Sequence, residues 1–209
     1  MPDAPQDDPE AGDHYFTARP SSPDERRAIT VRLADRDVTV ETAGGVFSPG
    51  RIDQGTRVLL GSAPKPPPRG DLLDLGCGWG PLALTLALQS PQARVWAVDV
   101  NERALDLVRR NAERLGLSNV RAVTPDDVPD VALAALWSNP PIRVGKTALH
   151  AMLERWLPRL APGAQGHLVV QRNLGADSLE RWLRETLPVT VTRTATSKGF
   201  RVLRIDPQA

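Results

Sequence analysis

The stretch "DLLDLGCGWGPLAL", residues 71–84, decides the fold of this chain. It opens with a short apolar run typical of a buried strand, and it ends with an apolar segment that begins with a proline, as helices often do. Between them lie Gly76, Gly78 and Gly80 at alternate positions. One glycine is enough for a tight strand-to-helix turn, whereas three let the backbone and its amide groups approach a ligand closely. The stretch therefore predicts a strand–loop–helix unit whose loop binds a ligand.

Strands and helices continue to alternate after this unit. We expect helices over 81–90, 102–117, 147–160 and 178–187, and strands over 94–100, 119–124, 131–138 and 166–171. Pro162-Gly163 is expected to end the helix over 147–160. Strands that alternate with helices indicate a parallel sheet covered on both faces. The last two strands, 189–195 and 200–205, have a short link and therefore cannot run parallel to each other. The fold class is α/β, with a mostly parallel seven-stranded sheet that contains one antiparallel strand.

The region before residue 71 divides into three parts. Residues 1–13 are acidic and rich in Pro, Gly and Ala, which predicts a disordered tail. Within 14–62, apolar and polar residues alternate on both sides of Asp35-Arg36-Asp37, which predicts a β-hairpin. Residues 63–70, "APKPPPRG", predict a stiff polyproline-like connector. This connector is a soft boundary between the hairpin region and the main α/β unit, 71–209.

The composition is that of an ordinary globular protein. Of the 209 residues, 41% are hydrophobic and 24% are charged, and the net charge of +1 gives no global basic field. Arginine greatly outnumbers lysine, which suits phosphate recognition but also follows from GC-rich coding. The single cysteine, Cys77, excludes an intrachain disulfide and a cysteine cluster for zinc, and we expect no metal. The apolar segments are too short to span a bilayer, and the first residues do not resemble a signal peptide. We expect a cytoplasmic protein, with a monomer favoured.

Acidic residues lie near the ends of the predicted strands. Asp74 precedes the glycine loop, where its negative charge would oppose the pyrophosphate of a dinucleotide, and Pro81 replaces the last small residue of the dinucleotide fingerprint. Asp74 suits a cation instead, for example the amino group of a zwitterionic methionine tail. Asp99 ends the next strand, where an acid can accept hydrogen bonds from both ribose hydroxyls, while Asn101 is the better helix cap. Asp126 follows the third strand, where it either meets an adenine amino group or is an ordinary turn aspartate.

Together, "DLGCGWG", "AVDVN" and "SNPP" resemble the class I S-adenosylmethionine-dependent methyltransferases. The resemblance implies a Rossmann-like fold and S-adenosyl-L-methionine as the cofactor. It also implies that the glycine loop cradles the methionine part, that Asp99 holds the ribose and that the segment after the fourth strand holds the methyl acceptor.

A closer resemblance covers nearly all of the chain after residue 13. The stretches "GVFSPGRIDQGTRVLL", "VDVNERAL", "SNPPIRVGK", "VVQRNLGADSLERWL" and "SKGFRVLR" are similar to the small-subunit ribosomal RNA guanine-N2 methyltransferase family, which includes short single-domain members. The partner that this implies is ribosomal RNA or the small ribosomal subunit. The resemblance also implies that the hairpin region packs on the catalytic domain and closes over the cofactor. The cofactor site that it implies comprises Phe47, Ser48, Asp74, Gly76, Cys77, Gly78, Gly80, Asp99, Val100, Asn101, Asp126 and Asn139.

The sequence departs from that family in two ways. Longer members carry an additional N-terminal methyltransferase-like domain, which is not found in this sequence. Position 142 is Ile, whereas the Asn-Pro-Pro motif of the family continues with an aromatic residue. The second departure weakens the expectation of base stacking at this position.

The stretch "WSNPPIRVGK", residues 137–146, supplies what N-methylation requires. An exocyclic amino group is a poor nucleophile because its lone pair is delocalised, and two hydrogen-bond acceptors can turn that lone pair toward the methyl group. The side-chain oxygen of Asn139 and the carbonyl of Pro140 are such a pair, and the proline rings hold them rigidly. The predicted catalytic segment is therefore Asn139, Pro140, Pro141 and Ile142. Catalysis then depends on positioning and electrostatics and needs no general base.

A guanine inside a helix cannot reach such a site, so the base must be unpaired or flipped out, with Ile142 or Phe47 against its face. Candidate contacts to the RNA phosphates, each of which could equally be a solvated surface charge, are Arg143, Lys146, Arg172 and Lys198. Two alternatives remain open at the level of sequence. The first is N-methylation of a protein glutamine amide or of DNA adenine, and the second is a non-catalytic cofactor-binding fold that binds RNA.

Overall fold

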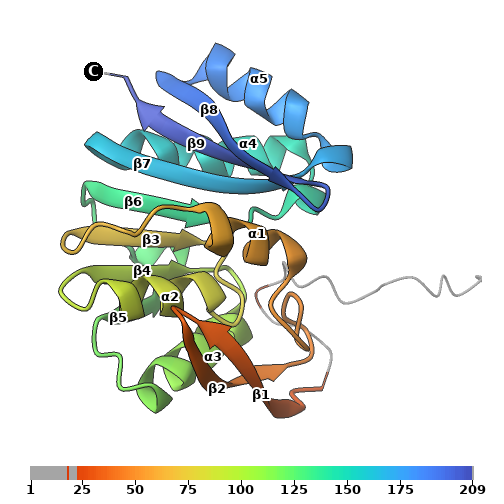
Figure 1. Ribbon diagram of the computed structural model, residues 1–209, viewed down its shortest axis with the longest axis vertical. Helices are drawn as coiled ribbons and strands as arrows, with labels where there is room; N and C mark the ends of the chain where they lie inside the picture. Colours follow the sequence, from red (N-terminus) through yellow and green to blue (C-terminus); the bar gives the residue numbers. More distant parts are fainter. Residues whose placement is uncertain (1–17, 19–22, 209) are drawn as a thin grey trace, which may run out of the picture.

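The central feature of the molecule is a seven-stranded sheet in the order β5-β4-β3-β6-β7-β9-β8 (Figure 1). The computed structural model describes Ala18 and residues 23–208, so the predicted tail over 1–13 lies outside the described residues. Neighbouring strands are parallel from β5 to β7, whereas β9 runs antiparallel to β7 and β8. This confirms the predicted α/β fold with one antiparallel strand. The strands are β3 (Asp71–Leu75), β4 (Arg94–Val98), β5 (Val120–Val123), β6 (Leu133–Ser138), β7 (Leu160–Gln171), β8 (Val189–Ser197) and β9 (Phe200–Pro207).

Helices cover both faces of the sheet. Alternate strand residues point to opposite faces, so that Leu72 joins one apolar core and Leu73 the other. The first core includes α1, α2 and α3, and the second includes α4 and α5. The bounds are α1 (Gln54–Ser62), α2 (Pro81–Gln89), α3 (Glu102–Arg114), α4 (Lys146–Trp156) and α5 (Ala176–Thr186).

Helix α1 was not among the expected elements. Its N-cap is Asp53, whose carboxylate accepts the backbone N–H groups of Gly55 and Thr56. The helix then buries Val58 and Leu59 against the sheet. The segment that follows, 63–70, has neither helix nor strand before β3 begins. The predicted connector is therefore preceded by a helix that ends at Ser62.

Helix α4 ends earlier than its apolar pattern suggests. The expectation of a helix to residue 160 is wrong, because α4 ends at Trp156 and Leu160 already begins β7. Pro158 has no N–H group to donate to the carbonyl four residues earlier, so the α-helical ladder stops there. A short 3₁₀ turn, Leu157–Arg159, makes the connection. Pro162-Gly163 lies inside the early part of β7 rather than at the end of the helix.

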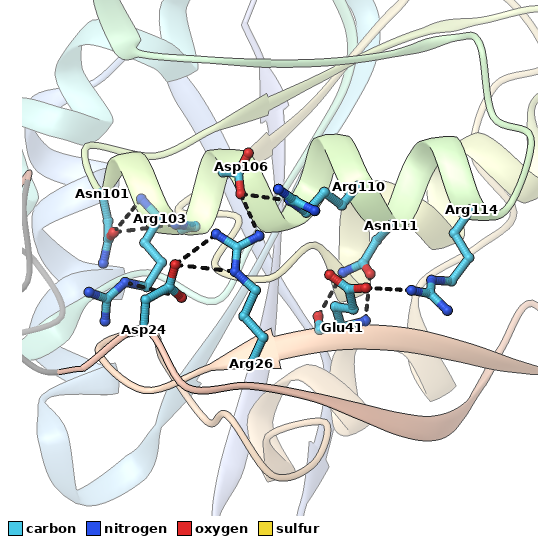
Figure 2. A network of polar contacts seen from close by, with 10 residues as sticks. Asp24, Arg26, Glu41, Asn101, Arg103, Asp106, Arg110, Asn111 and Arg114 are labelled. Carbon is cyan, nitrogen blue, oxygen red and sulfur yellow. Dashed lines mark hydrogen bonds and ion pairs between the residues drawn. The ribbon is translucent and has the colours of Figure 1, made fainter.

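The N-terminal hairpin docks on α3 through polar side chains (Figure 2). Strands β1 (Arg26–Leu33) and β2 (Arg36–Ala43) are antiparallel, and Ala34 and Asp35 both have positive φ in the two-residue turn, as a type I′ turn requires. The buried side chain of Asn111 on α3 exchanges hydrogen bonds of 2.6 and 2.9 Å with the backbone of Glu41 on β2. Partly exposed ion pairs flank this contact.

Two further observations concern the described residues. No helix in this part of the chain has the length and apolar character needed to cross a membrane. The same residues contain no group of three or more His, Cys, Asp or Glu side chains placed to hold a metal ion.

Candidate active site

A cavity of about 860 Å³ opens at the carboxyl ends of strands β3 to β7. Its walls come from the glycine loop, the segment before α1, the segment after β6 and one side of α4. A cavity of this size accommodates a nucleoside-sized ligand. The predicted site residues that line it are Phe47, Ser48, Gly76, Gly78, Asp99, Val100, Asn101, Asn139, Pro140, Pro141, Ile142 and Arg143. Folding therefore brings the three sequence motifs to one cavity.

Four of the predicted cofactor residues, Asp74, Cys77, Gly80 and Asp126, do not line this cavity. Asp74 and Cys77 border a small cavity of about 20 Å³ that shares Gly76, Gly78 and Asn139 with the large one. Gly80 borders neither, and a Cβ on it would lie 3.0 Å from a side-chain carbon of Val108. Gly80 therefore serves the packing of the loop against α3.

The expectation that Asp126 meets an adenine amino group is not supported by its position. Its side chain is 88% exposed and forms an ion pair of 2.8 Å with Arg155 on α4. The neighbouring Pro125 lines the cavity instead. The structure therefore favours the alternative of a turn aspartate, here in a short 3₁₀ turn that spans Pro125–Asp127.

The predicted phosphate-binding cations lie near the opening to different degrees. Arg143 lines the cavity, whereas Lys146 begins α4. The backbone N–H of Arg172 donates to the carbonyl of Gly199 at 2.8 Å, which brings Arg172 close to the β8–β9 turn that contains Lys198. Within the described residues, none of these four cations belongs to an ion pair.

The glycine loop serves the site by its shape rather than by free amide groups. The N–H groups of Gly76 and Cys77 donate to the carbonyl of Val98, and the N–H of Gly78 donates to Asp99. These three N–H groups therefore hold the end of β4, and the close approach of the loop to a ligand stays a prediction. Gly76 and Gly78 have φ of 77° and 53°, and a Cβ on Gly78 would meet no atom within 4 Å. The missing side chains leave the inner wall of the cavity open.

Asp99 is fixed at the end of β4 with both carboxylate oxygens engaged. One oxygen accepts the N–H of Gly78 at 2.9 Å, and the other accepts the N–H of Asn101 at 3.0 Å. Burial raises the pKa of Asp99, while these backbone donors act in the opposite direction. Each carboxylate oxygen has a further lone pair, so the side chain can still accept hydroxyl groups from the cavity. The carboxamide of Asn101 caps α3 and donates to the carbonyl of Gly45 at 2.8 Å, so it holds the wall together.

Asp74 on β3 is completely buried, and its carboxyl group lies against the first turn of α2. Its Oδ2 accepts the N–H of Ala83 at 2.8 Å, but its Oδ1 has no hydrogen-bond partner among the described residues. Burial raises the pKa of Asp74 to about 8, and the nearby charge of Asp99 acts in the same direction. An orphaned carboxyl oxygen beside a small cavity calls for a hydrogen-bond donor, and an ammonium group would satisfy it best.

The segment before α1 is tied to the glycine loop by an indole. Trp79 is 1% exposed, and its Nε1 donates to the carbonyl of Ser48 at 3.2 Å. Ser48 has a positive φ of 50°, and its hydroxyl donates to the carbonyl of Arg51. These contacts hold the 39% exposed Phe47 at the wall of the cavity. Trp79 is thus a core residue that places a wall of the site.

Asn139 lies at the end of β6 with its amide nitrogen engaged. Its Nδ2 donates to Oδ2 of Asp53 at 2.9 Å and to the hydroxyl of Thr56 at 3.1 Å. Its Oδ1 accepts no hydrogen bond from the described residues and is not among the buried polar atoms that lack a partner. Asn139 also lines the cavity. The carbonyl of Pro140 accepts the N–H of Ile142 at 2.8 Å, which leaves it one lone pair for a ligand. Two acceptors from consecutive residues therefore border the cavity.

Asp53, Thr56 and Phe200 are among the residues of the site that were not predicted from the sequence. Asp53 carries a local signal, since an aspartate before a helix is a typical N-cap, but that signal says nothing of a contact with Asn139. Phe200 begins β9 and lines the cavity beside α1, where a Cβ on Gly55 would lie only 2.9 Å from its ring. The absence of a side chain at Gly55 therefore makes room for the Phe200 ring.

The site suits S-adenosylmethionine, the group that the sequence implies. Asp99 offers acceptors for ribose hydroxyls, the orphaned Oδ1 of Asp74 suits an ammonium group, and Gly76 and Gly78 leave room along the inner wall. When bound, the cofactor would supply a methyl group on a sulfonium sulfur. The acceptors of Asn139 and Pro140 border the same cavity.

Comparisons with known proteins identify relatives of this chain. The family model "Methyltransferase small domain" matches residues 37–204. An uncharacterized protein of Bacillus subtilis (strain 168), YbxB, is 34% identical over 196 residues, which cover 92% of this chain and 97% of that protein. The ribosomal RNA small subunit methyltransferase C of Stutzerimonas stutzeri (strain A1501) is 36% identical over 184 residues, which cover 85% of this chain and 54% of that protein.

Solved structures show the same relationship. The 16S rRNA N2 methyltransferase (RsmC) of T. thermophilus, in complex with AdoMet and guanosine, matches with a TM-score of 0.77 and 26% identity over 89% of this chain and 52% of that one. A SAM-dependent methyltransferase of Aquifex aeolicus, at 18% identity and a TM-score of 0.58, shares the fold. The chain spans about half the length of the methyltransferase C relatives that it matches. It belongs to the methyltransferase small domain family, as an RsmC-like class I methyltransferase that uses S-adenosylmethionine.

Proposed function

We propose that this protein methylates the exocyclic N2 amino group of a guanine in small-subunit ribosomal RNA. The observation that carries the proposal is the pair of acceptors, Oδ1 of Asn139 and the carbonyl of Pro140, in one cavity with Asp99. The similarity to a 16S rRNA N2 methyltransferase in complex with AdoMet and guanosine supports it.

The proposed chemistry is a direct transfer to nitrogen. The two acceptors take hydrogen bonds from the two N–H groups of the base, so the nitrogen lone pair points toward the methyl group. A nitrogen–carbon bond forms as the carbon–sulfur bond breaks, and the sulfonium charge is lost. The nitrogen becomes acidic as it acquires the methyl group, so its proton leaves to water without a general base. The chain contributes chiefly position and electrostatic complementarity.

The target base would rest on apolar side chains at the cavity wall. Ile142 is aliphatic and offers less stacking than an aromatic residue would. Phe47 and Phe200 both line the cavity, and either ring can supply an aromatic face. We therefore propose that Phe200 takes over part of the stacking that Ile142 lacks. Arg143, Lys146, Arg172 and Lys198 would contact flanking phosphates.

A methyl-transfer assay tests the proposed function. The protein is incubated with methyl-labelled S-adenosylmethionine and naked 16S rRNA, assembled small subunits, DNA or total protein, and the products are digested and identified. The expected product is N2-methylguanosine in RNA. Label in protein glutamine or in DNA adenine, with none in RNA, would overturn the proposal. Binding of RNA and cofactor with no transfer to any of the four substrates would point to a non-catalytic role.

The variant Asn139→Ala tests the catalytic assignment. We expect it to bind cofactor almost normally and to lose turnover by about 100-fold or more, the scale of removing an acceptor that acts in the transition state. Calorimetry with S-adenosylmethionine and the transfer assay measure the two quantities separately. An equal loss of cofactor affinity would show that Asn139 serves the cofactor instead.

A further inference from the structure

We propose that Asp53 is a positioning residue that fixes which end of the Asn139 carboxamide meets the substrate. This inference rests on the proposed N-methylation and deepens it. Asp53 is the N-cap of α1, and its carboxylate accepts a hydrogen bond from Asn139, which follows 86 residues later in the sequence.

The contact is specific in its direction. Oδ2 of Asp53 lies 2.9 Å from Nδ2 of Asn139, and Oγ1 of Thr56 lies 3.1 Å from the same nitrogen. A carboxylate accepts hydrogen bonds and cannot donate them, so the part of the carboxamide that faces Asp53 must be the NH₂ group. Because Thr56 is 3% exposed, its hydroxyl faces the amide with little competition from water. The oxygen of the carboxamide therefore points away from α1.

This direction decides what the site can bind. With Oδ1 available, Asn139 accepts a hydrogen bond from an amino group. If the carboxamide were turned around, its NH₂ group would face the NH₂ group of the substrate, and two donors would oppose each other. An isolated asparagine has no strong preference between these two states. Asp53 and Thr56 supply the preference, so the specificity of the site for an amino group depends on them.

Asp53 also has a structural role, and the two roles can be separated. The same Oδ2 accepts the N–H groups of Gly55 at 2.7 Å and Thr56 at 3.3 Å as the N-cap of α1. Serine caps helices about as well as aspartate. Its side chain is one bond shorter, so we expect its hydroxyl to lie too far from Nδ2 of Asn139 for a hydrogen bond. Asparagine caps equally well and keeps an oxygen at the position of Oδ2. Asp53→Ser therefore removes the contact with Asn139 and keeps the cap, whereas Asp53→Asn keeps both.

Turnover is the first measurement. We expect Asp53→Ser to lower kcat by about 10- to 100-fold, the scale of one hydrogen bond to a charged group, without a change in the Kd for S-adenosylmethionine. Thr56→Val should give a smaller loss, and Asp53→Asn should recover most of the turnover. The matched control is Ser62→Ala. The hydroxyl of Ser62 donates to the carbonyl of Val58 at the end of α1 opposite to Asp53, so this variant should leave kcat unchanged. All four variants should keep the thermal midpoint of the wild type within about 2 °C.

The side-chain NH₂ resonances of Asn139 give a readout independent of activity. They are assigned by their loss in Asn139→Ala, and we expect them to shift and broaden in Asp53→Ser but not in Ser62→Ala. Wild-type kcat in Asp53→Ser, or unchanged Asn139 resonances in that variant, would overturn the inference. If the wild type methylates a different amino substrate, kcat is measured on that substrate. If it methylates none, the proposed function fails and the resonances still decide the role of Asp53.

Discussion

At the scale of a single residue, Asp74 combines complete burial with a carboxyl oxygen that has no hydrogen-bond partner among the described residues. A carboxyl group that is completely buried, with one oxygen lacking a partner, lowers the stability of the protein when it is charged. Burial accordingly raises the pKa of Asp74 to about 8, so the cofactor-free protein holds this proton at neutral pH. The unfolded chain releases the same proton near the ordinary value of 3.8.

The difference in pKa makes stability depend on pH. Between about pH 4 and pH 8 the folded protein binds more protons at Asp74 than the unfolded chain does, so the free energy of unfolding falls as pH rises. We expect the stability of the wild type relative to Asp74→Asn to decrease by up to about 1.4 kcal/mol per pH unit across this window. Urea titrations of both proteins at several pH values measure it. A constant difference would show that Asp74 ionises normally.

The same group should link cofactor binding to pH. In the proposed site the ammonium group of S-adenosylmethionine favours the charged form of Asp74, so binding below pH 8 expels the proton. We expect cofactor affinity in the wild type to rise from about pH 6 to pH 8 more steeply than in Asp74→Asn, which keeps only the titration of the cofactor itself. Calorimetry in buffers of different ionisation enthalpy should detect the released proton. Parallel pH profiles would remove Asp74 from the binding site.

At the scale of secondary-structure elements, the hairpin β1–β2 and helix α3 form one unit. Asn111 is fully buried and bonds to both backbone groups of Glu41 and to the carbonyl of Trp79. It therefore joins the hairpin, α3 and the glycine loop at one point. We propose on this basis that the hairpin region is part of the catalytic unit.

Removing this carboxamide should be costly, whereas removing a nearby surface charge should not. Asn111→Ala leaves a buried N–H and two carbonyls unsatisfied, and we expect it to lower the free energy of unfolding by roughly 2–4 kcal/mol. Arg114→Ala, which removes the half-exposed ion pair with Glu41, should cost less than about 1 kcal/mol. Thermal or urea unfolding compares the two. Similar costs would mean that surface charge, rather than Asn111, holds the hairpin on α3.

At the scale of the whole molecule, positive and negative charges nearly balance, but only some of the cationic side chains that the structure describes form ion pairs. The net charge is +1, and many arginines are neutralised locally, as Arg193 and Arg201 are by Asp177. Across the described residues, the four predicted phosphate-binding cations form no ion pair, although the charge of Arg172 contributes to lowering the pKa of Asp177. Nucleic-acid binding would therefore depend on a local cluster rather than on the total charge.

This arrangement predicts the salt dependence of RNA binding. Replacing Arg143, Lys146, Arg172 and Lys198 together by glutamine should weaken binding and reduce the slope of log K against log salt by about 0.7 for each lost phosphate contact. Affinity for S-adenosylmethionine should stay the same. Filter binding at several salt concentrations measures the slope. Replacement of the exposed Lys65 and Arg69, in the connector before β3, is the control and should leave it unchanged.

The sequence predicted well those features that repeat over a few residues. Alternation of apolar and polar residues indicated the strands and the hairpin, because each strand exposes its two faces differently. The glycine loop, Asp99 and the Asn-Pro-Pro segment could be placed at one edge of the sheet, since the carboxyl ends of parallel strands meet there. The end of α4 was missed because the apolar pattern outweighed the single Pro158, which stops the helix.

The sequence by itself therefore determined the α/β class and predicted which residues bind an adenosylmethionine and an amino group. Tertiary structure decided how those residues are used. The N–H groups of the glycine loop donate to residues at the end of β4. Asp126 pairs with Arg155, and Asp53 orients Asn139. Each of these outcomes depends on a hydrogen-bond partner that is distant in the sequence. A local pattern specifies the groups a residue carries, but only the folded chain decides which groups are already paired and which remain available.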